Sequence, residues 1–285
     1  MSIVYLNGHY LPMEDAKISP MDRGFLFGDG IYEVVPAYGV RMVGFRPHIE
    51  RMQNGLAAIG IALDWNEQRW RELCEQLIER NGSGDLGIYL HVSRGADNKR
   101  YHAYPEGIEP TVFGFTFEIP PSPVADKSST KTYTVTTTED LRWKRCNIKS
   151  TALLGNVIHF NQSYDGGNNE TILYNAAGEL TEASACNVYV VKDGKIVTPE
   201  TDHQILPGIT RLLLLKILRA DGSLAIQERP VTLAELRDAD EVWISSSTKE
   251  IAPVVRVDGE RVGDGTVGDT WLAAQSLFSA HKYEY

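Results

Sequence analysis

A proline- and serine-rich segment divides this chain and constrains its fold more than any other feature. The stretch IPPSPVADKSST, residues 119–130, carries three prolines and three serines and shows no hydrophobic periodicity. Such a composition is typical of a linker. The sequence therefore predicts a domain at 1–120, an interdomain linker at 121–130 and a second domain at 131–285. The chain has 285 residues, so each half is long enough to bury a core of its own.

The first half shows the patterns of two helices packed on a mainly antiparallel sheet. Asn7-Gly8 stands between two short β-rich runs and predicts a type I′ hairpin. Residues 86–95 and 110–119 are predicted strands. Two segments, 45–61 and 65–82, repeat apolar residues at helical spacing. Their buried faces are predicted to comprise Ile49, Met52, Leu56 and Ile59 in the first and Trp70, Leu73, Leu77 and Ile78 in the second.

The second half alternates strand, hairpin and helix signals. Helices are predicted at 152–164, 208–220 and 232–238, the last with a capping box formed by Thr232 and Glu235. Strands are predicted at 132–139 and at the apolar segment 241–246. Hairpin turns are expected at Ala177-Gly178, Asp193-Gly194 and Asp258-Gly259. The whole pattern predicts an α+β protein.

Charge and cysteine content narrow the classes of partner. The formal net charge is −10, which disfavours nucleic acid and anionic membrane surfaces, so any site for an anionic substrate must be locally basic. No apolar run approaches the roughly 20 residues that span a bilayer, and the N-terminus lacks the pattern of a signal peptide. The cysteines, Cys74, Cys146 and Cys186, are too few and too widely spaced for a disulfide framework or a zinc site. We therefore expect a cytoplasmic protein without a metal centre.

Lys149 is the residue whose position most needs an explanation. It follows Cys146–Ile148, which is predicted to end a strand, and precedes a predicted helix. A lysine at such a junction is expected to lie inside the fold, where an unpaired ammonium is costly. A buried lysine at this position therefore needs a reason.

Four other segments carry candidate site residues, and each has an alternative structural interpretation. The run Leu206–Thr210 predicts an anion site at a helix N-terminus, or simply a capped helix. The hydroxyls of Ser245–Thr248 suit a phosphate, or form a polar loop. Glu182 enters a predicted core and needs a cationic partner, or it faces water. The cluster of Arg94, Arg100 and His102 could hold a carboxylate, or belong to a solvated loop.

Five segments in this order resemble one enzyme family over essentially the whole chain. They are DRGFLFGDGIYEVV, RWKRCNIKS, LTEASACNV, PGITR and SSSTKEI. The pattern is similar to that of the fold-type IV pyridoxal-phosphate enzymes, the group of branched-chain and D-amino acid aminotransferases. Within that group, CNIKS and the Arg-x-His of residues 100–102 most resemble D-amino acid aminotransferase. The resemblance implies a two-domain α+β fold with a smaller N-terminal α/β sandwich and a larger, β-barrel-like C-terminal domain with helices.

The resemblance also implies roles for individual residues. Lys149 matches the lysine that holds pyridoxal 5′-phosphate as a Schiff base and moves the proton during the exchange. Glu182 matches the carboxylate that pairs with the protonated ring nitrogen. The other matches are the phosphate-binding residues Arg51, Ile209, Thr210, Ser246 and Ser247, Leu206 beneath the ring with Asn187 beside it, and the trap for the substrate α-carboxylate, Tyr32, Arg100 and His102.

The activity implied is ping-pong exchange of an amino group between a D-amino acid, such as D-alanine or D-glutamate, and a 2-oxo acid, such as pyruvate or 2-oxoglutarate. In the family the Arg and His of the trap come from the other subunit, which implies a homodimer with active sites shared across the interface. Two residues depart from the D-amino acid aminotransferase pattern: Ala185 stands where serine is common, and His91 replaces a polar amide. The alternatives are a branched-chain L-aminotransferase, an aminodeoxychorismate lyase-like enzyme and a non-catalytic pyridoxal-phosphate carrier.

Overall fold

The computed structural model describes residues 2–82 and 84–285, which form two compact units. The first comprises Met1–Pro121 together with Ile148–Leu153, and the second comprises Ser122–Asn147 and Leu154–Tyr285. The chain thus returns to the first unit for the six residues around Lys149 before it continues in the second. None of the helices in the described ranges is both long and apolar enough to cross a membrane.

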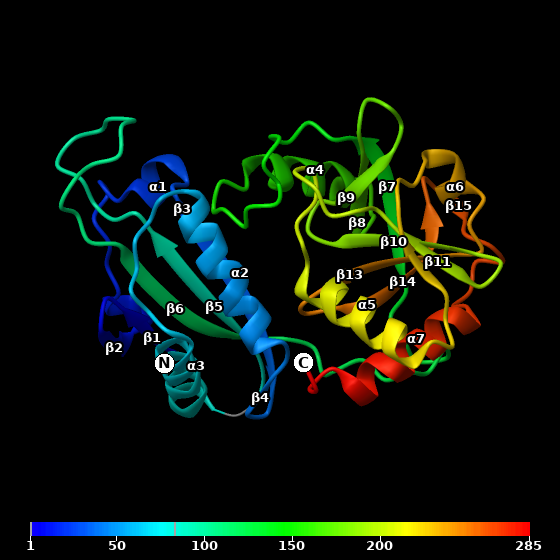
Figure 1. The fold of residues 1–285 in the computed structure, drawn as a ribbon, viewed down its shortest axis with the longest axis horizontal. Helices are drawn as coiled ribbons and strands as arrows, with labels where there is room; N and C mark the ends of the chain where they lie inside the picture. Colours follow the sequence, from blue (N-terminus) through cyan, green and yellow to red (C-terminus); the bar gives the residue numbers. More distant parts are fainter. Residues whose placement is uncertain (1, 83) are drawn as a thin grey trace. The chain divides into compact units, whose positions relative to one another are not determined.

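The first unit contains a six-stranded antiparallel sheet within the described residues, in the order β2-β1-β6-β5-β3-β4. The helices α2 and α3 pack on one face of this sheet (Figure 1). The unit's elements in chain order are β1 (Ile3–Leu6), β2 (His9–Pro12), the 3-10 helix η1 (Met13–Asp15), α1 (Arg23–Phe27), β3 (Gly30–Tyr38), β4 (Arg41–Met42), α2 (Phe45–Ala58), α3 (Glu67–Asn81), β5 (Asp85–Ser93) and β6 (Thr111–Glu118).

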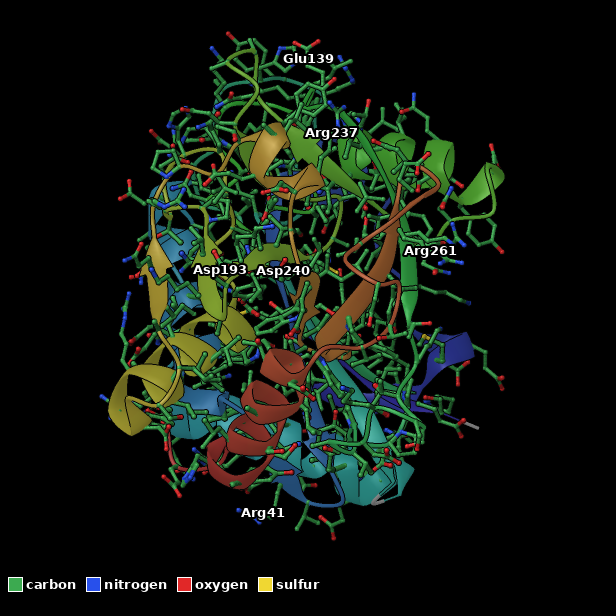
Figure 2. The ribbon with its side chains drawn as sticks, turned by 90° about the vertical axis from the view of Figure 1, so that its right-hand side faces the viewer. Arg41, Glu139, Asp193, Arg237, Asp240 and Arg261 are labelled. Carbon is green, nitrogen blue, oxygen red and sulfur yellow. The ribbon has the colours of Figure 1, made fainter. Side chains whose placement is uncertain are left out.

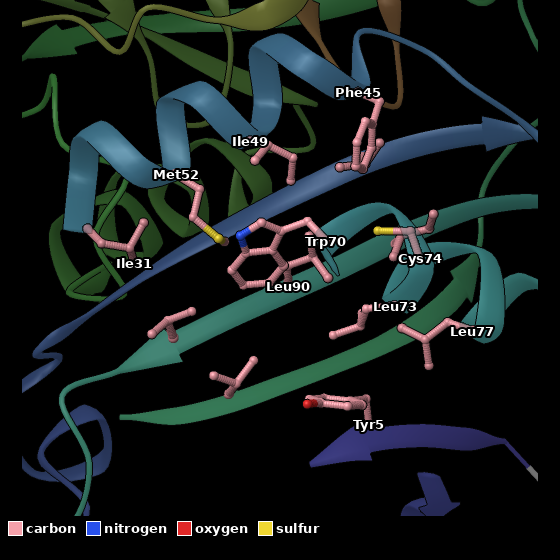
Figure 3. Packing of buried hydrophobic residues seen from close by; sticks show 14 of the residues in the cluster. Tyr5, Ile31, Phe45, Ile49, Met52, Trp70, Leu73, Cys74, Leu77 and Leu90 are labelled. Atoms are coloured by element: carbon pink, nitrogen blue, oxygen red, sulfur yellow. The ribbon is translucent and has the colours of Figure 1, made fainter. Parts of the chain in front are cut away.

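The predicted helical faces of the first unit form its core. Met52 and Trp70 are fully buried between the helices and the sheet, with Ile49, Leu73 and Leu77 around them (Figure 3). Ile59 lies just beyond α2 and is only partly buried. The helical predictions are therefore confirmed, since one apolar stripe on each helix supplies the contacts.

Turn chemistry fixes the first hairpin. Asn7 and Gly8 have φ values of 47° and 97°, the positive values that a type I′ turn requires at both central residues. This turn joins β1 to β2 with Tyr5 opposite Tyr10. The predicted Asn7-Gly8 hairpin is confirmed, because asparagine and glycine tolerate this backbone conformation better than other residues.

The second unit contains a nine-stranded mixed sheet within the described residues, whose main path is β12-β11-β10-β13-β14-β7-β8-β9. The pairs β14–β7, β7–β8 and β11–β12 are parallel, and β9 also lies against β10, so the sheet curls toward a barrel. Its elements are β7 (Tyr133–Glu139), α4 (Leu154–Asp165), β8 (Glu170–Tyr174), β9 (Leu180–Ala183), β10 (Asn187–Lys192), β11 (Lys195–Thr198), α5 (Ile209–Asp221), β12 (Ile226–Glu228), α6 (Leu233–Arg237), β13 (Glu241–Ser246), β14 (Glu250–Val257), β15 (Glu260–Arg261) and α7 (Asp269–His281).

Local signals in the second unit are confirmed except at one place. The turns Asp193-Gly194 and Asp258-Gly259 have positive φ at both residues, and Thr232 and Glu235 form the predicted capping box. The correction concerns Cys146–Ile148, which form a turn instead of the end of a strand. The amide of Cys146 donates to the carbonyl of His203, a loop residue, and no strand in the described part of the chain pairs with this run.

A buried ion pair ties α7 to the start of β14. Lys282 donates to the carboxylate of Glu250 and to the hydroxyl of Ser122, and Gln275 donates to the other oxygen of Glu250 at 2.8 Å. Glu250 itself adopts φ of 53°, an unusual value for a glutamate. The contacts of its carboxylate hold this backbone conformation, which closes the turn after Ser246.

Candidate active site

The segment Ile148–Leu153 docks on the start of β3 through backbone hydrogen bonds. The amide of Tyr32 donates to the carbonyl of Lys149 at 3.0 Å, and the amide of Thr151 donates to the carbonyl of Gly30 at 3.0 Å. Ser150 forms an antiparallel bridge with Ile31. These bonds place the Nζ of Lys149 4.2 Å from the centroid of the Tyr32 ring. Lys149 as a whole is partly buried, so it is less enclosed than we expected for a lysine inside the fold.

A second charged group of the first unit lies on the opposite side of β3. Arg51 donates to both carboxylate oxygens of Glu33, at 2.7 and 2.8 Å, and the Nδ1 of His48 lies 2.7 Å from one of them. Burial pushes the pKa of Glu33 upward, but the charges and hydrogen bonds of Arg51 and His48 outweigh it and bring the pKa to about 2. Burial, assisted by the positive charges of Arg51 and Lys149, lowers the pKa of His48 below its ordinary value despite the opposing effect of Glu33.

The role of Glu33 in holding Arg51 was missed from the sequence, although a signal exists. Side chains alternate between the two faces of a strand. In β3 the apolar residues Ile31 and Val35 are buried, and Glu33 occupies the same face between them. A single carboxylate in such a stripe indicates a buried cationic partner.

Tyr32 lies in a row of aromatic side chains on the other face of this sheet. Its ring stacks on Tyr89 with centroids 5.7 Å apart, and the hydroxyl of Tyr89 lies 3.1 Å from the Nδ1 of His91. Burial raises the pKa of Tyr89 to about 12 and lowers the pKa of His91, against the weaker opposing effect of Asp22. The lowered pKa favours the neutral form of His91, which stands where the family pattern has a polar amide and which is hydrogen-bonded to Tyr89.

The residues Arg100 and His102 lie exposed on a loop whose backbone is bound by the buried side chain of Arg23. Arg23 donates to the carbonyls of Tyr101 and His102 at 2.6 and 3.3 Å, and its own Nε is paired with Asp29 at 2.8 Å. Within residues 2–82 and 84–285, no hydrogen bond or ring contact joins Tyr32 to Arg100 or His102 of the same chain.

Arg94 does not belong with these two exposed residues. It is buried, and its guanidinium donates to both oxygens of Asp29 and to the carbonyls of Ile59 and Gly60. Its donors are thus engaged by Asp29 and by the residues that follow α2, and the expected cluster of Arg94, Arg100 and His102 is wrong for Arg94.

In the second unit, Glu182 enters the core from β9. Its side chain is buried, and three donors reach it: the Nη1 of Arg142 at 2.6 Å, the amide of Leu206 at 3.0 Å and the Nδ2 of Asn187 at 3.4 Å. Burial raises the pKa of Glu182 to about 7, with Arg142 and the Leu206 amide acting in the opposite direction. A carboxylate balanced in this way can respond to a cationic partner by becoming fully ionised.

Asn187 links Glu182 to the start of α5. Its Nδ2 also donates to the carbonyl of Leu206 at 2.9 Å. At Gly208, an added Cβ would lie 2.0 Å from the Oδ1 of Asn187, so only glycine permits this approach. Ile209 and Thr210 follow as the first residues of α5 and are buried. The first amides of a helix have no partner within the helix and attract anions.

Residues Ser245–Thr248 form a hydroxyl-rich turn that begins at the end of β13. This turn lies beside Asn187, because β13 pairs with β10 and places Ser245 opposite Asn187. Ser245 is bonded to the hydroxyl of Tyr189 at 2.9 Å. The Oγ of Ser246 is shielded from solvent and makes no hydrogen bond of good geometry within the described part of the chain, although it interacts with the buried thiol of Cys186. Ser247 is partly buried next to it, whereas Ala185 is exposed and takes no part in these contacts.

Each unit thus holds its own set of predicted site residues. The first contains Lys149 with Tyr32, and Arg51 with Glu33. In the second, hydrogen bonds and strand register bring together Glu182, Asn187, Leu206, Gly208–Thr210 and Ser245–Ser247. This second set has an acceptor for a buried cation, together with helix amides and a shielded hydroxyl that suit an anion.

Comparisons with known proteins agree with the fold. Residues 30–257 match the family described as amino-transferase class IV. The chain is 38% identical to a D-alanine aminotransferase of Listeria monocytogenes over 93% of its length and 91% of that protein. It is 37% identical to a D-alanine aminotransferase of Staphylococcus epidermidis over 99% of its length and 98% of that protein.

Two solved structures share the architecture. The branched-chain amino acid aminotransferase of Escherichia coli superposes with a TM-score of 0.90 at 24% identity, over 98% of this chain and 94% of that one. A hypothetical aminotransferase from Mycobacterium tuberculosis, in a PLP-bound form, superposes with a TM-score of 0.84 at 19% identity, over 98% of each chain. The predicted two-domain α+β fold is confirmed.

Proposed function

The chain belongs to the class IV family of pyridoxal-phosphate-dependent aminotransferases, and we propose that it exchanges an amino group between a D-amino acid, such as D-alanine or D-glutamate, and a 2-oxo acid. The observation that carries this substrate class is the near-full-length identity of 37–38% to D-alanine aminotransferases of two genera. The branched-chain aminotransferase structure shares the fold at only 24% identity, so it does not argue for branched-chain substrates.

The residues of the second unit fit pyridoxal phosphate. Three features match its phosphate group: the N-terminus of α5, the close approach at Gly208 and the shielded Oγ of Ser246. The Glu182 carboxylate matches a protonated ring nitrogen. We propose that the phosphate is bound by Ile209, Thr210, Ser246, Ser247 and Arg51, and that Leu206 and Asn187 contact the ring.

When bound, pyridoxal phosphate supplies an aldehyde carbon that accepts amines and a ring that takes up electrons from the Cα–H bond. Lys149 would hold the aldehyde carbon through its amine. When it is not holding the cofactor, its Nζ would serve as the base that accepts the proton from the substrate Cα and as the acid that donates it again. Glu182 would accept a hydrogen bond from the protonated ring nitrogen, and the low dielectric around its buried carboxylate would strengthen this contact.

We propose a homodimer whose active sites are shared across the interface. Arg100 and His102 are exposed on a supported loop and do not contact Tyr32 of the same chain. The guanidinium of Arg100 and the imidazole of His102 can donate hydrogen bonds to the α-carboxylate of a substrate at the Tyr32 of a second copy. The three cysteines are free, which suits a reducing cytoplasm as the place of action.

The substrate class is tested by single half-reactions. The holoenzyme is mixed with D-alanine or L-alanine in the absence of a 2-oxo acid, and the absorbance of the lysine-bound cofactor is followed. We expect rapid loss of this absorbance with D-alanine and little with L-alanine. Faster reaction with L-alanine or L-leucine contradicts the proposal, as does the absence of reaction with any amino acid.

A further inference from the structure

The carboxylate of Glu182 is held by an ion-pair network that extends away from the ligand-binding residues. The Nη1 of Arg142 donates to Glu182 at 2.6 Å, while its Nε and Nη2 donate to the two oxygens of Asp140 at 3.0 and 2.8 Å. One guanidinium thus bridges two carboxylates. The three side chains are only 4–10% exposed, so solvent screens their charges weakly.

The network is fixed at its far end as well. Asp140 accepts a hydrogen bond from the hydroxyl of Thr181 at 2.8 Å, and its Oδ1 accepts one from the backbone amide of Arg142 at 3.1 Å. The Nη2 of Arg142 also donates to the carbonyl of Gln204 at 3.3 Å. Because these contacts fix the orientation of its guanidinium, Arg142 determines where the Glu182 carboxylate points.

The charges of the network have a chemical consequence. Arg142 and Glu182 alone form a neutral pair, which has little attraction for a cation. Asp140 adds one negative charge, so the three groups together carry a net charge of −1 when ionised. A single cation placed against Glu182 makes the buried site neutral, which is the condition under which buried charges are best tolerated.

We propose that Asp140 and Arg142 are positioning residues for the ring nitrogen of the cofactor: Arg142 orients Glu182, and Asp140 cancels the charge of Arg142 so that the site favours a proton on that nitrogen. This inference rests on the function proposed above and extends it to two residues whose hydrogen bonds, within residues 2–82 and 84–285, reach the proposed ligand-binding groups only at Glu182.

The test compares two ligands that differ only at the ring nitrogen. Cofactor-free protein is titrated with pyridoxal phosphate and with its analogue that has carbon in place of the ring nitrogen, and the ratio of the two dissociation constants is measured. The charge of Asp140 is separated from the proposed position of the ring nitrogen by the pair of Arg142 and Glu182. At an effective dielectric of about 20, removing this charge changes the proton affinity of the ring nitrogen about tenfold. The isosteric variant Asp140→Asn should therefore reduce the preference for pyridoxal phosphate over the analogue about tenfold.

Two further variants make the result decisive. Asp240→Asn is the matched control, because Asp240 is an exposed aspartate of the same unit that pairs with Lys192 and accepts from the amide of Asp193 (Figure 2). It should leave the ratio unchanged. Glu182→Gln should reduce the ratio at least as much as Asp140→Asn. If Glu182→Gln reduces it and Asp140→Asn does not, the inference is overturned while the proposed function stands. If Glu182→Gln has no effect, the role proposed for Glu182 fails, and the inference fails with it.

A second measurement needs no cofactor. In the cofactor-free protein, the ionisation of Glu182 is followed by carbon-13 NMR of labelled glutamate. The wild-type midpoint is expected near pH 7, and Asp140→Asn should lower it, because a neighbouring negative charge has been removed. A midpoint that does not move overturns the inference even if the variant fails to retain cofactor.

Discussion

Replacing Glu33 with glutamine should destabilise the first unit by about 3 kcal/mol at pH 7. The pKa of Glu33 falls from 4.5 to about 2 in the fold, because Arg51 and His48 outweigh the effect of burial. At 1.36 kcal/mol for each tenfold change in proton affinity, this corresponds to about 3 kcal/mol. Glutamine keeps the shape of the side chain but cannot carry the charge, and it leaves the guanidinium of Arg51 without its carboxylate.

The sign of the pH dependence follows from the direction of this pKa. A carboxyl group with a depressed pKa stabilises the folded state fully above its ordinary pKa of 4.5, and the stabilisation disappears as the pH falls toward 2. The difference between wild type and Glu33→Gln should therefore be constant from pH 7 to about pH 5 and become smaller below it. Urea unfolding at several pH values measures this narrowing.

The magnitude at pH 7 is measured by hydrogen exchange of the β3 and α2 amides, which reports on the first unit alone. The matched control is Glu50→Gln on α2. Glu50 pairs with Arg46 at 2.9 Å, but the two side chains are 56% and 72% exposed, so the loss should stay below about 1 kcal/mol. The reasoning is refuted if these amides exchange as slowly in the Glu33→Gln variant as in the wild type. It is also refuted if Glu50→Gln lowers the stability of the first unit as much as Glu33→Gln does.

Three further predictions concern the proposed site. Lys149→Ala should lower turnover by at least ~10²–10⁴-fold, and borohydride reduction of the wild type should attach the cofactor to the peptide containing Lys149 and to no other lysine. Glu182→Gln should slow the D-alanine half-reaction while phosphate-dependent retention of the cofactor on dialysis stays near that of wild type; unchanged half-reaction rates would exclude the ring-nitrogen role. Arg100→Ala should weaken the binding of amino acids and 2-oxo acids together by ~2–5 kcal/mol and affect a carboxylate-free amine much less, and equal losses for all three would contradict a carboxylate trap.

Local patterns predicted most of the secondary structure. The apolar residues around Trp70 and Leu73 recur at a spacing that places them on one face of an α-helix, and Asn7-Gly8 favours one type of turn. These signals lie within a few residues of one another in sequence. The parallel pairing of β14 with β7 and of β7 with β8 has no comparable local signal, because tertiary packing determines which strands far apart in sequence pair with each other.

The candidate site shows the same division between local and non-local information. Sequence patterns selected Glu182 and Asn187, which the structure joins by a hydrogen bond. The partnership of Arg142 with Glu182 spans 40 residues, and no periodicity indicates it. The turn at Cys146–Ile148 was predicted as the end of a strand because the run is short and partly apolar, and such runs are ambiguous. The return of Ile148–Leu153 to the first unit likewise depends on backbone bonds to β3 that no local pattern announces.

The buried pair of Glu250 and Lys282 bears on how the protein is made. Lys282 follows Glu250 by 32 residues and Ser122 by 160, so a ribosome completes β14 well before the partner of its buried carboxylate exists. Until then, burying Glu250 would leave a charge without compensation, which opposes closure of the turn after Ser246. Domains generally fold as units during synthesis. Closure of the turn after Ser246, which carries the proposed phosphate-binding residues Ser246 and Ser247, should therefore wait for the pairing of Glu250 with Lys282.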